Sequence, residues 1–580
     1  MPALFQIPFR ARRLPLLLIP LLQLGLPLDA SAQARSQAEI DSANRAVEQI
    51  QREQQERQQQ QLLKDSQRGR PTPPQELPEI KAPSLPRSGT CREIKEIVFS
   101  GVALLPASLT DELKAPYLGK CLYVEDIETL LASVLKAYIE RGYIAVRPYL
   151  KAQDLNSGRL EILIVEGKVE GLRLQDDGRH SVNLGTAFPF VVGTPLNLRD
   201  IEQGLDQINR LASNNATMEV SPGEEPGESI VSITNTPAFP LSASASLNNL
   251  GSPSTGENQG SLTVSLDNPL RVNDFITYTH ANTLLEGNSL RDSTSDSIFY
   301  SLPLGYWTLQ FSGNASDYHT PVVTPTRTLV ARGESDSFRS ELNRVAYRDR
   351  DQKLTALVAI TRKSSKNYLD DEFLSISSRK LTILDIAANW VRRFPGVTVS
   401  ASLGWSKGLR WFDALEDLSD IDPSAPHAQG SKITYSGGLQ IPFAVHGQDF
   451  SFSSQLTGQY ALNPLYGSEQ INIGSYYSVR GFNRYSLSGD RGYFLRNEVS
   501  TSLAKLPLAN VTPRPFLGFD LGRIAGYKET DAATFSGAAA GVRFAGRYLI
   551  AEISAAKSIA VPDAIKREPA RYSVTVTASF

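Results

Sequence analysis

The stretch GVTVSASLGW, residues 396–405, indicates the fold of the larger part of this chain. Its side chains alternate between an apolar set (Val397, Val399, Ala401, Leu403 and Trp405) and a small polar set (Thr398, Ser400, Ser402 and Gly404). A period of two places successive side chains on opposite faces of a β-strand. The same alternation recurs in residues 261–266 and in the C-terminal YSVTVTASF, residues 572–580. A soluble β-sandwich shows the same pattern, so alternation alone leaves that alternative open.

The N-terminus has the pattern of a segment that directs export from the cytoplasm. Three arginines at positions 10, 12 and 13 precede an apolar run over residues 14–26, and the small residues ASA follow at 30–32. This is the order of a secretory signal peptide, which we place at residues 1–32, with cleavage after Ala32 or Ala34. No later stretch approaches the roughly 18 to 20 apolar residues that a helical membrane span requires. We therefore expect the mature chain to leave the cytoplasm without a helical anchor.

Export without a helical anchor favours a membrane barrel over a sandwich. Only a closed barrel satisfies every backbone polar group in lipid when no helix spans the membrane. Residues 238–580 offer about 340 positions, enough for roughly sixteen strands of about 9 to 11 residues with their turns and loops. We predict a mostly β protein with a transmembrane antiparallel β-barrel in the bacterial outer membrane.

Composition argues against several classes of function. The chain has 580 residues, is 41% hydrophobic and carries a formal charge of -2, so nothing suggests a nucleic-acid partner. The sequence has no GxSxG elbow and no phosphate-binding glycine loop. The 5 histidines lack metal-ligand spacing: His180, His280, His319, His427 and His446. We expect no catalytic residues, metal or cofactor. An outer-membrane hydrolase with a site built from distant loops is the alternative.

Two cysteines, Cys91 and Cys121, stand about thirty residues apart in a chain expected in an oxidising compartment. We expect one local disulfide, with two free thiols as the alternative.

Before the cysteines, residues 33–68 are rich in Gln, Glu, Arg and Lys and have almost no apolar stripe, so they form either a disordered segment or a helix surrounded by water. Residues 69–90 are proline-rich and read as an extended linker.

Residues 91–167 and 168–237 carry two copies of one β-α-α-β-β pattern. In the first copy, helix-spaced apolar residues predict a helix over 124–141 that ends at Gly142. In the second, Leu198, Ile201, Leu205, Ile208 and Leu211 line one face of a helix, with strands on either side. Each copy has about seventy residues, enough for one small core.

This order, with the fragments YIERGY (138–143), EGKVEG (166–171), NRLASN (209–214) and PGEEPGES (222–229), resembles the paired POTRA modules of two-partner secretion outer-membrane transporters. The resemblance implies that the modules lie in the periplasm and receive a large unfolded exoprotein, often by lending a sheet edge to an incoming strand. Spacer modules without a binding role are the alternative. The resemblance also implies a sixteen-stranded barrel and an N-terminal helix that plugs the lumen at rest.

The resemblance continues in SYYSVRGFNRYSLSGDRGYFLRNE (475–498) and FLGFDLG (516–522). Val479, Arg480, Gly481 and Phe482 are similar to the tip of the loop that folds back into the lumen in these transporters, and Asp520 and Gly522 match the family's inner wall. The implied contact joins Arg480 to Asp520 as a latch, because an arginine fork can hold a carboxylate in bidentate geometry. A purely architectural salt bridge is the alternative. Four further charged residues of the motif region could extend the network: Asp490, Arg491, Arg496 and Glu498.

The C-terminal Phe580 resembles the signal that the barrel assembly machinery reads, and an ordinary edge strand is the alternative. The expected partners are therefore the exoprotein, outer-membrane lipid and lipopolysaccharide, and the assembly machinery during biogenesis. Two other functions remain open at this point. A barrel-assembly insertase usually carries more than two modules and typically lacks the polar segment and proline linker, whereas a passive porin has no need of modules.

Overall fold

The computed structural model describes residues 60–61, 89–284, 290–323, 327–504 and 511–580. The predicted signal peptide with its cleavage site lies outside these residues, as do the polar segment apart from Gln60 and Gln61 and the linker up to residue 88. Within the described ranges, no helix is both long enough and apolar enough to cross a membrane.

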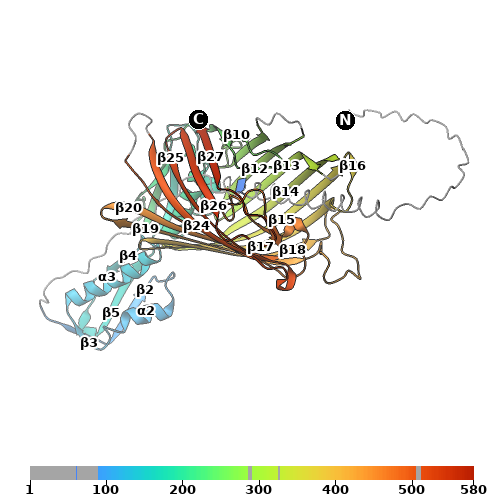
Figure 1. Cartoon of the computed structure of the whole chain (residues 1–580). Helices are drawn as coiled ribbons and strands as arrows, with labels where there is room; N and C mark the ends of the chain where they lie inside the picture. The colour runs from blue at the N-terminus through green and yellow to red at the C-terminus, as the bar shows by residue number, and fades with distance from the viewer. Residues whose placement is uncertain (1–59, 62–88, 285–289, 324–326, 505–510) are drawn as a thin grey trace, which may run out of the picture.

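The first module folds as the sequence predicts, with two helices packed on a three-stranded sheet ordered β2-β5-β4. Helix α3 buries Ile127, Leu130, Val134 and Tyr138 in the core and stops before Gly142, whose φ of +93° favours glycine. A ribbon of β1 and β3, which the periodicity did not indicate, carries Cys121. The elements of the first module are β1 (Arg92–Ile94), β2 (Glu96–Ser100), α2 (Ala107–Lys114), β3 (Lys120–Leu122), α3 (Val124–Glu140), β4 (Arg147–Leu150) and β5 (Arg159–Val165). Figure 1 shows this module outside the barrel wall.

The second module repeats this topology. In the first module β2 pairs in parallel with the central strand β5, and β4 pairs antiparallel with β5. In the second module β6 pairs in parallel with the central strand β8, and β7 pairs antiparallel with β8. Helix α5 places Ile201, Leu205 and Ile208 in the core, as its spacing predicts. The elements are β6 (Lys168–Gln175), α4 (Leu184–Ala187), α5 (Leu198–Asn209), β7 (Ala216–Pro222) and β8 (Glu228–Asn235).

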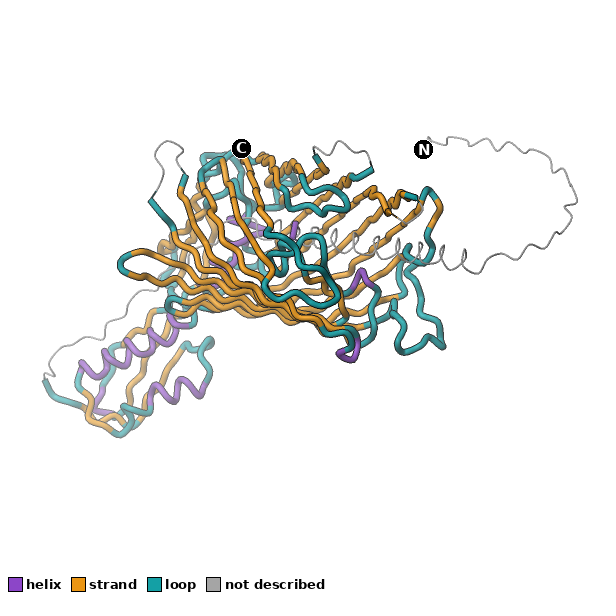
Figure 2. Tube along the Cα trace, in the orientation of Figure 1, coloured by secondary structure: helices purple, strands orange, loops and turns teal. Residues whose placement is uncertain are grey.

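The remaining chain forms a closed antiparallel barrel of 16 strands, in agreement with the expected number. The wall closes where β27 pairs with β9, from Thr575 opposite Asn248 to Ser579 opposite Ser244. Figure 2 shows the wall as strand throughout. The two-residue β16 (Glu372–Phe373) extends one hairpin of the barrel. The wall strands are β9 (Leu241–Asn248), β10 (Gln259–Asp267), β11 (Phe275–Thr283), β12 (Asp292–Leu304), β13 (Trp307–Val323), β14 (Thr328–Arg348), β15 (Gln352–Leu369), β17 (Arg379–Phe394), β18 (Val397–Leu409), β19 (Ser431–Val445), β20 (Gln448–Ala461), β23 (Arg491–Thr501), β24 (Thr512–Ala525), β25 (Ala533–Ala545), β26 (Leu549–Ser558) and β27 (Arg571–Ser579).

The alternation in residues 396–405 separates an outer face toward lipid from an inner face of small and polar residues. On β18, Leu403 is 62% exposed and Trp405 is 37% exposed, while Gly404 and Ser406 are buried. The apolar set therefore points outward, as it does in transmembrane barrels. Strand lengths differ from the expected 9 to 11 residues, since β14 has 21. The surplus residues extend the strands beyond the span that crossing the membrane requires.

The second module is attached directly to the turns at the adjacent end of the barrel. Tyr306, in the turn between β12 and β13, donates a hydrogen bond of 2.6 Å to Asp200 on α5. Arg348, at the end of β14, donates at 3.0 Å to Gln203 and pairs with Asp206. Burial and the hydrogen bond to Asp200 raise the pKa of Tyr306. These contacts fix the module at the entrance of the barrel.

Candidate functional site

The candidate site is a loop over residues 462–490, between β20 and β23, which we call the lumen loop. It contains a 3₁₀ turn (Gly467–Glu469) and a small hairpin of β21 (Ile471–Ile473) and β22 (Leu487–Gly489). The hairpin packs against β24. On β24, Leu517 is 68% exposed toward lipid, whereas Asp520 is fully buried, so Asp520 faces the interior. The loop therefore folds back into the lumen.

The loop tip is held by an apolar seat. Val479 and Phe482 are buried and cluster with Ile473, Ile524 and Phe535. The rings of Phe482 and Phe535 meet edge to face with centroids 5.2 Å apart, a favoured aromatic geometry. The sequence predicted these two tip residues as part of the motif but gave no partner for them.

Arg480 and Asp520 meet as the sequence comparison implied. The Arg480 side chain donates from Nε to Oδ2 at 2.7 Å and from Nη2 to Oδ1 at 2.7 Å. Its backbone N–H donates to the same Oδ2 at 3.0 Å. Asp520 thus binds both the side chain and the main chain of Arg480, and the two side chains are almost wholly enclosed by protein. Bidentate charge-assisted pairs of this kind combine strength with fixed orientation.

Glycines in the wall make this approach possible. A Cβ on Gly518 would lie 2.2 Å from the Arg480 guanidinium, and a Cβ on Gly537 would lie 1.8 Å from the Arg480 carbonyl oxygen. Gly481 has a φ of +99° and faces the backbone of Lys557 and Ser558 at 2.4 Å from its ideal Cβ. Gly522 lies beneath Val479, since a Cβ at this position would come within 2.9 Å of the Val479 side chain. Side chains at these positions would push the loop off the wall.

The charged network continues beyond the predicted pair. Arg480 Nη1 donates to Glu498 on β23 at 3.1 Å, and Glu498 also pairs with Arg543 on β25. Arg543 donates to Glu552 on β26 at 2.8 Å, and Glu552 accepts from the Tyr476 hydroxyl at 2.6 Å. The sequence had indicated Glu498 as a possible member of this network but not Arg543, Glu552 or Tyr476. The signal for Arg543 and Glu552 was a single charge within runs of small and apolar residues, as in AAAGVRFA and LIAEISAA.

The other charged residues of the motif region have separate places. Arg496 donates to the Tyr477 carbonyl oxygen at 3.2 Å and so also contacts the loop. Asp490 accepts backbone N–H groups of Leu465 at 2.9 Å and Tyr527 at 3.0 Å, which ties down the loop base. The Arg491 guanidinium lies 4.0 Å from the Tyr460 ring centroid. Only Arg496 and Glu498 of the four belong to the surroundings of Arg480.

Glu568, in the loop between β26 and β27, was not predicted from the sequence. Its carboxylate accepts the backbone N–H groups of Asn483, Arg484 and Tyr485 at 3.0 to 3.1 Å. Three consecutive N–H groups directed at one carboxylate form a strong, charge-assisted contact. The residues that follow Arg480 are therefore fixed as firmly as Arg480 itself.

Three of the motif fragments stabilise the modules: two meet inside the first module, and one joins the second module to the barrel. Tyr138, from YIERGY, donates to Glu166, from EGKVEG, at 2.7 Å, and burial together with this hydrogen bond raises the pKa of Tyr138. Arg210, from NRLASN, donates to the Asn273 carbonyl oxygen at 3.0 Å, in the turn between β10 and β11. Burial lowers the pKa of Arg210 to about 10, so its guanidinium remains charged near neutral pH.

The remaining predicted sites lie apart from the lumen loop. Cys91 and Cys121 form a disulfide with Cα atoms 5.3 Å apart in the first module. Phe580 ends the chain after β27, 78% exposed, and its backbone N–H donates to the Ala243 carbonyl oxygen at 2.8 Å. Gln61, in a helical turn, donates to the lumen-facing Thr279 at 3.3 Å. The part of the chain that the structure describes holds no group of three or more side chains suited to a metal ion.

Comparison with known proteins agrees with this architecture. Residues 227–544 match the family described as haemolysin secretion/activation protein ShlB/FhaC/HecB, and residues 93–167 and 168–222 match POTRA domains, the former of ShlB type. The chain is 34% identical over 498 residues to the outer membrane transporter CdiB of Dickeya dadantii, which spans 85% of this chain and 87% of that protein. It is 31% identical over 449 residues to the hemolysin transporter protein ShlB of Serratia marcescens, which spans 77% of this chain and 78% of that protein.

A solved structure gives the same result. CdiB from Escherichia coli matches with a TM-score of 0.83 and 31% identity, over 91% of this chain and 98% of that chain. The likeness includes both the modules and the barrel, since it extends over nearly the whole of both chains. This chain therefore belongs to the ShlB/FhaC/HecB family of haemolysin secretion/activation proteins.

Proposed function

We propose that this outer-membrane protein exports a large secreted polypeptide in two-partner secretion. Its family and its relatives are secretion proteins and transporters of the outer membrane. The observation that carries the proposal is a 16-strand barrel with two POTRA modules at its entrance and a pinned loop inside its lumen. A passive porin has no need of the modules.

The modules would receive the exported chain while it is unfolded. In the sheet order β2-β5-β4 the strand β4 has a neighbour on one side only among the described residues, and β7 has the same position in β6-β8-β7. Such an edge offers main-chain hydrogen bonds to any extended polypeptide, whatever its sequence. Direct contacts of α5 with the barrel turns would then deliver the bound segment to the lumen.

The lumen loop would act as the gate. Arg480 and Asp520 hold its tip against β24, and because the wall is closed, the loop must move aside for a chain to pass through the lumen. Competing water and polar groups of a passing chain can replace hydrogen bonds of an ion pair one at a time, which suits a releasable latch.

Residues 33–68 would plug the lumen at rest. The contact of Gln61 with Thr279 supports this proposal, because Thr279 lines the interior of β11 (Phe275–Thr283). A helix that is polar on every side is suited to a water-filled pore rather than to a protein core. Entry of the exported chain would displace it.

Other partners follow from the location. The outward apolar face of the barrel would contact lipid and lipopolysaccharide, and Phe580 would be read by the barrel assembly machinery during biogenesis. We propose transport without catalysis, with no metal or cofactor. Since the periplasm supplies no nucleotide, folding of the exported chain at the cell surface would bias its passage outward.

Deletion of residues 91–236 tests the receptor role. The variant and the full chain are each expressed with a candidate exoprotein of the two-partner secretion type, and the exported protein is measured in the medium. Heat-modifiable migration in gels reports whether the barrel is inserted. We expect an inserted barrel that exports nothing. Normal export by the truncated protein would refute the receptor role, and a fall in other outer-membrane proteins when the full chain is depleted would instead favour an insertase.

A further inference from the structure

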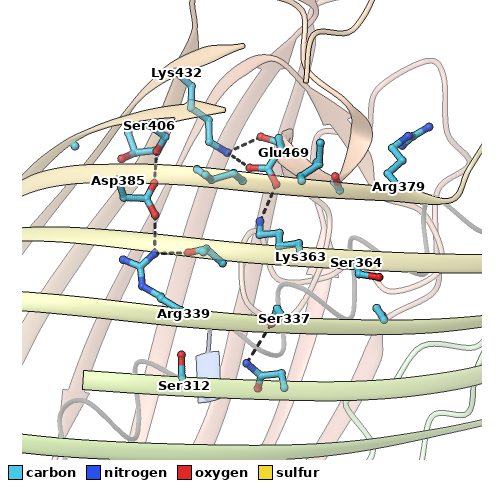
Figure 3. A pocket seen from close by; sticks show the side chains of 18 of the residues that line it. Ser312, Ser337, Arg339, Lys363, Ser364, Arg379, Asp385, Ser406, Lys432 and Glu469 are labelled. Atoms are coloured by element: carbon cyan, nitrogen blue, oxygen red, sulfur yellow. Dashed lines mark hydrogen bonds and ion pairs between the residues drawn. The ribbon is translucent and has the colours of Figure 1, made fainter. Parts of the chain in front are cut away.

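On the side of the lumen loop away from Arg480, the barrel contains a cavity of about 330 Å³ lined by polar and apolar residues of β13 to β19 and by the loop itself. Figure 3 shows two charged clusters at this cavity. In the first, Arg339 pairs with Glu341 and Asp385, both at the wall, at 2.7 and 2.6 Å. This cluster links wall strands to one another and does not involve the loop.

The second cluster joins the lumen loop to the wall. Glu469, at the end of the 3₁₀ turn, receives Lys363 of β15 on Oε1 at 2.7 Å and Lys432 of β19 on Oε2 at 3.1 Å. Lys432 also donates to the Glu469 carbonyl oxygen at 2.7 Å, and Gln459 of β20 donates to it at 3.0 Å. The Glu469 side chain is only 12% exposed. Three strands thus hold one residue of the loop.

A neighbouring contact supports the same segment of the loop. The Arg379 guanidinium of β17 lies 4.4 Å from the ring centroid of Tyr466, the residue before the 3₁₀ turn. Cation–π contacts of this geometry are attractive. The segment that leaves β20 is therefore attached to β15, β17 and β19, whereas the tip is attached to β23, β24 and β25.

We propose that Glu469, held by Lys363 and Lys432, is a second anchor of the lumen loop, so that opening the conduit requires release of both Glu469 and Arg480. This inference rests on the proposed gating role of the loop. The two anchors bind different parts of the wall, so either one alone keeps part of the loop across the lumen. Glu469 acts by positioning the loop and has no contact with a reacting group.

The chemistry of the two anchors differs in a useful way. Arg480 presents a rigid fork that matches its carboxylate, whereas lysine is a compact, strongly hydrated point charge on a flexible stem. Water and salt therefore loosen the Glu469 anchor more easily than the Arg480 anchor. We expect the anchor at Glu469 to open first and the one at Arg480 to set the final step.

Single-channel recording of the purified full-length protein in planar bilayers tests this, because opening is measured without any exported chain. Glu469→Gln keeps the size of the side chain and removes its charge. We expect a several-fold rise in the fraction of time spent open. The matched control is Glu529→Gln, which removes an acid paired with Arg523 at 3.3 Å in another loop, where both side chains are about half exposed.

The double variant Glu469→Gln/Arg480→Ala decides whether the anchors act together. We expect it to open more than either single variant. Opening of Glu469→Gln at the wild-type level, or a double variant no more open than Arg480→Ala alone, would overturn the proposal. If Arg480→Ala leaves the open fraction unchanged while Glu469→Gln raises it, the role of Glu469 as an anchor is supported and the role of Arg480 as a latch is refuted.

A further variant guards against a folding defect. If Glu469→Gln does not insert, Lys363→Gln leaves Glu469 with one lysine and should give an intermediate rise in opening. Wild-type opening by an inserted Lys363→Gln protein would then count against the anchor. Raised salt should increase opening of the wild type more than that of Glu469→Gln, because the variant has already lost the screened pair.

Discussion

Substituting Arg480 by alanine should impair export far more than it impairs insertion of the barrel. Asp520 is fully buried, and two of its contacts come from the Arg480 side chain at 2.7 Å each. The variant leaves this carboxylate buried without its main counter-charge, which costs about 3 to 5 kcal/mol. Because about 1.4 kcal/mol is a tenfold change in an equilibrium, the ratio of docked to released loop should fall on the order of a hundred- to a few thousand-fold.

The assay compares exported protein in the medium per inserted transporter, with protease sensitivity of the lumen loop from outside the cell as a structural readout. We expect reduced export, a protease-sensitive loop and normal heat-modifiable migration. Arg523→Ala is the control, since Arg523 is an exposed arginine with a single ion pair of 3.3 Å. Adding Asp520→Ala should restore part of the stability lost in Arg480→Ala, because no charge then remains buried. Wild-type export together with a protease-resistant loop in Arg480→Ala would refute the reasoning.

Two further predictions concern the N-terminal part. Deleting residues 35–67 should raise ion conductance in planar bilayers, because the proposed plug is removed; unchanged conductance would argue against a plug. Replacing Cys91 and Cys121 by serine should destabilise the first module by roughly 3 to 4 kcal/mol, since the bridge closes a loop of 30 residues. Protease digestion of that module in the full chain measures this loss, and equal digestion of the wild type under oxidising conditions would contradict it.

The alternating stretches predicted the barrel because membrane and lumen impose opposite demands on successive residues. On β18 this alternation locates Leu403 and Trp405 toward lipid without any tertiary information. Strand length was less predictable. The 21-residue β14 continues beyond the membrane, where both of its faces can be polar and the alternation no longer marks its ends.

The candidate site was predicted only as far as its motif extends. Arg480 and Asp520 were paired through resemblance, and the structure brings them together. Arg543, Glu552 and Glu568 lie on later strands and loops, and their meeting depends on barrel register, which no local pattern encodes. Glu469 was missed for the same reason, since its lysines are 106 and 37 residues away in the chain.

The seat of the loop tip also has a consequence for the order in which the barrel is built. Most of the groups that receive residues 480–485 come later in the chain: Asp520, Gly537, the backbone of residues 557 and 558, and Glu568. An earlier residue, Glu257, accepts a hydrogen bond from the Asn483 side chain at 3.0 Å. The tip can therefore dock fully only after β24, β25, β26 and the loop that follows β26 are in place. A nascent barrel that lacks these strands cannot yet hold the loop tip in place, so docking of the tip follows formation of the C-terminal part of the wall. Loss of the C-terminal strands would then leave the loop tip without its seat as well as the wall without its closure.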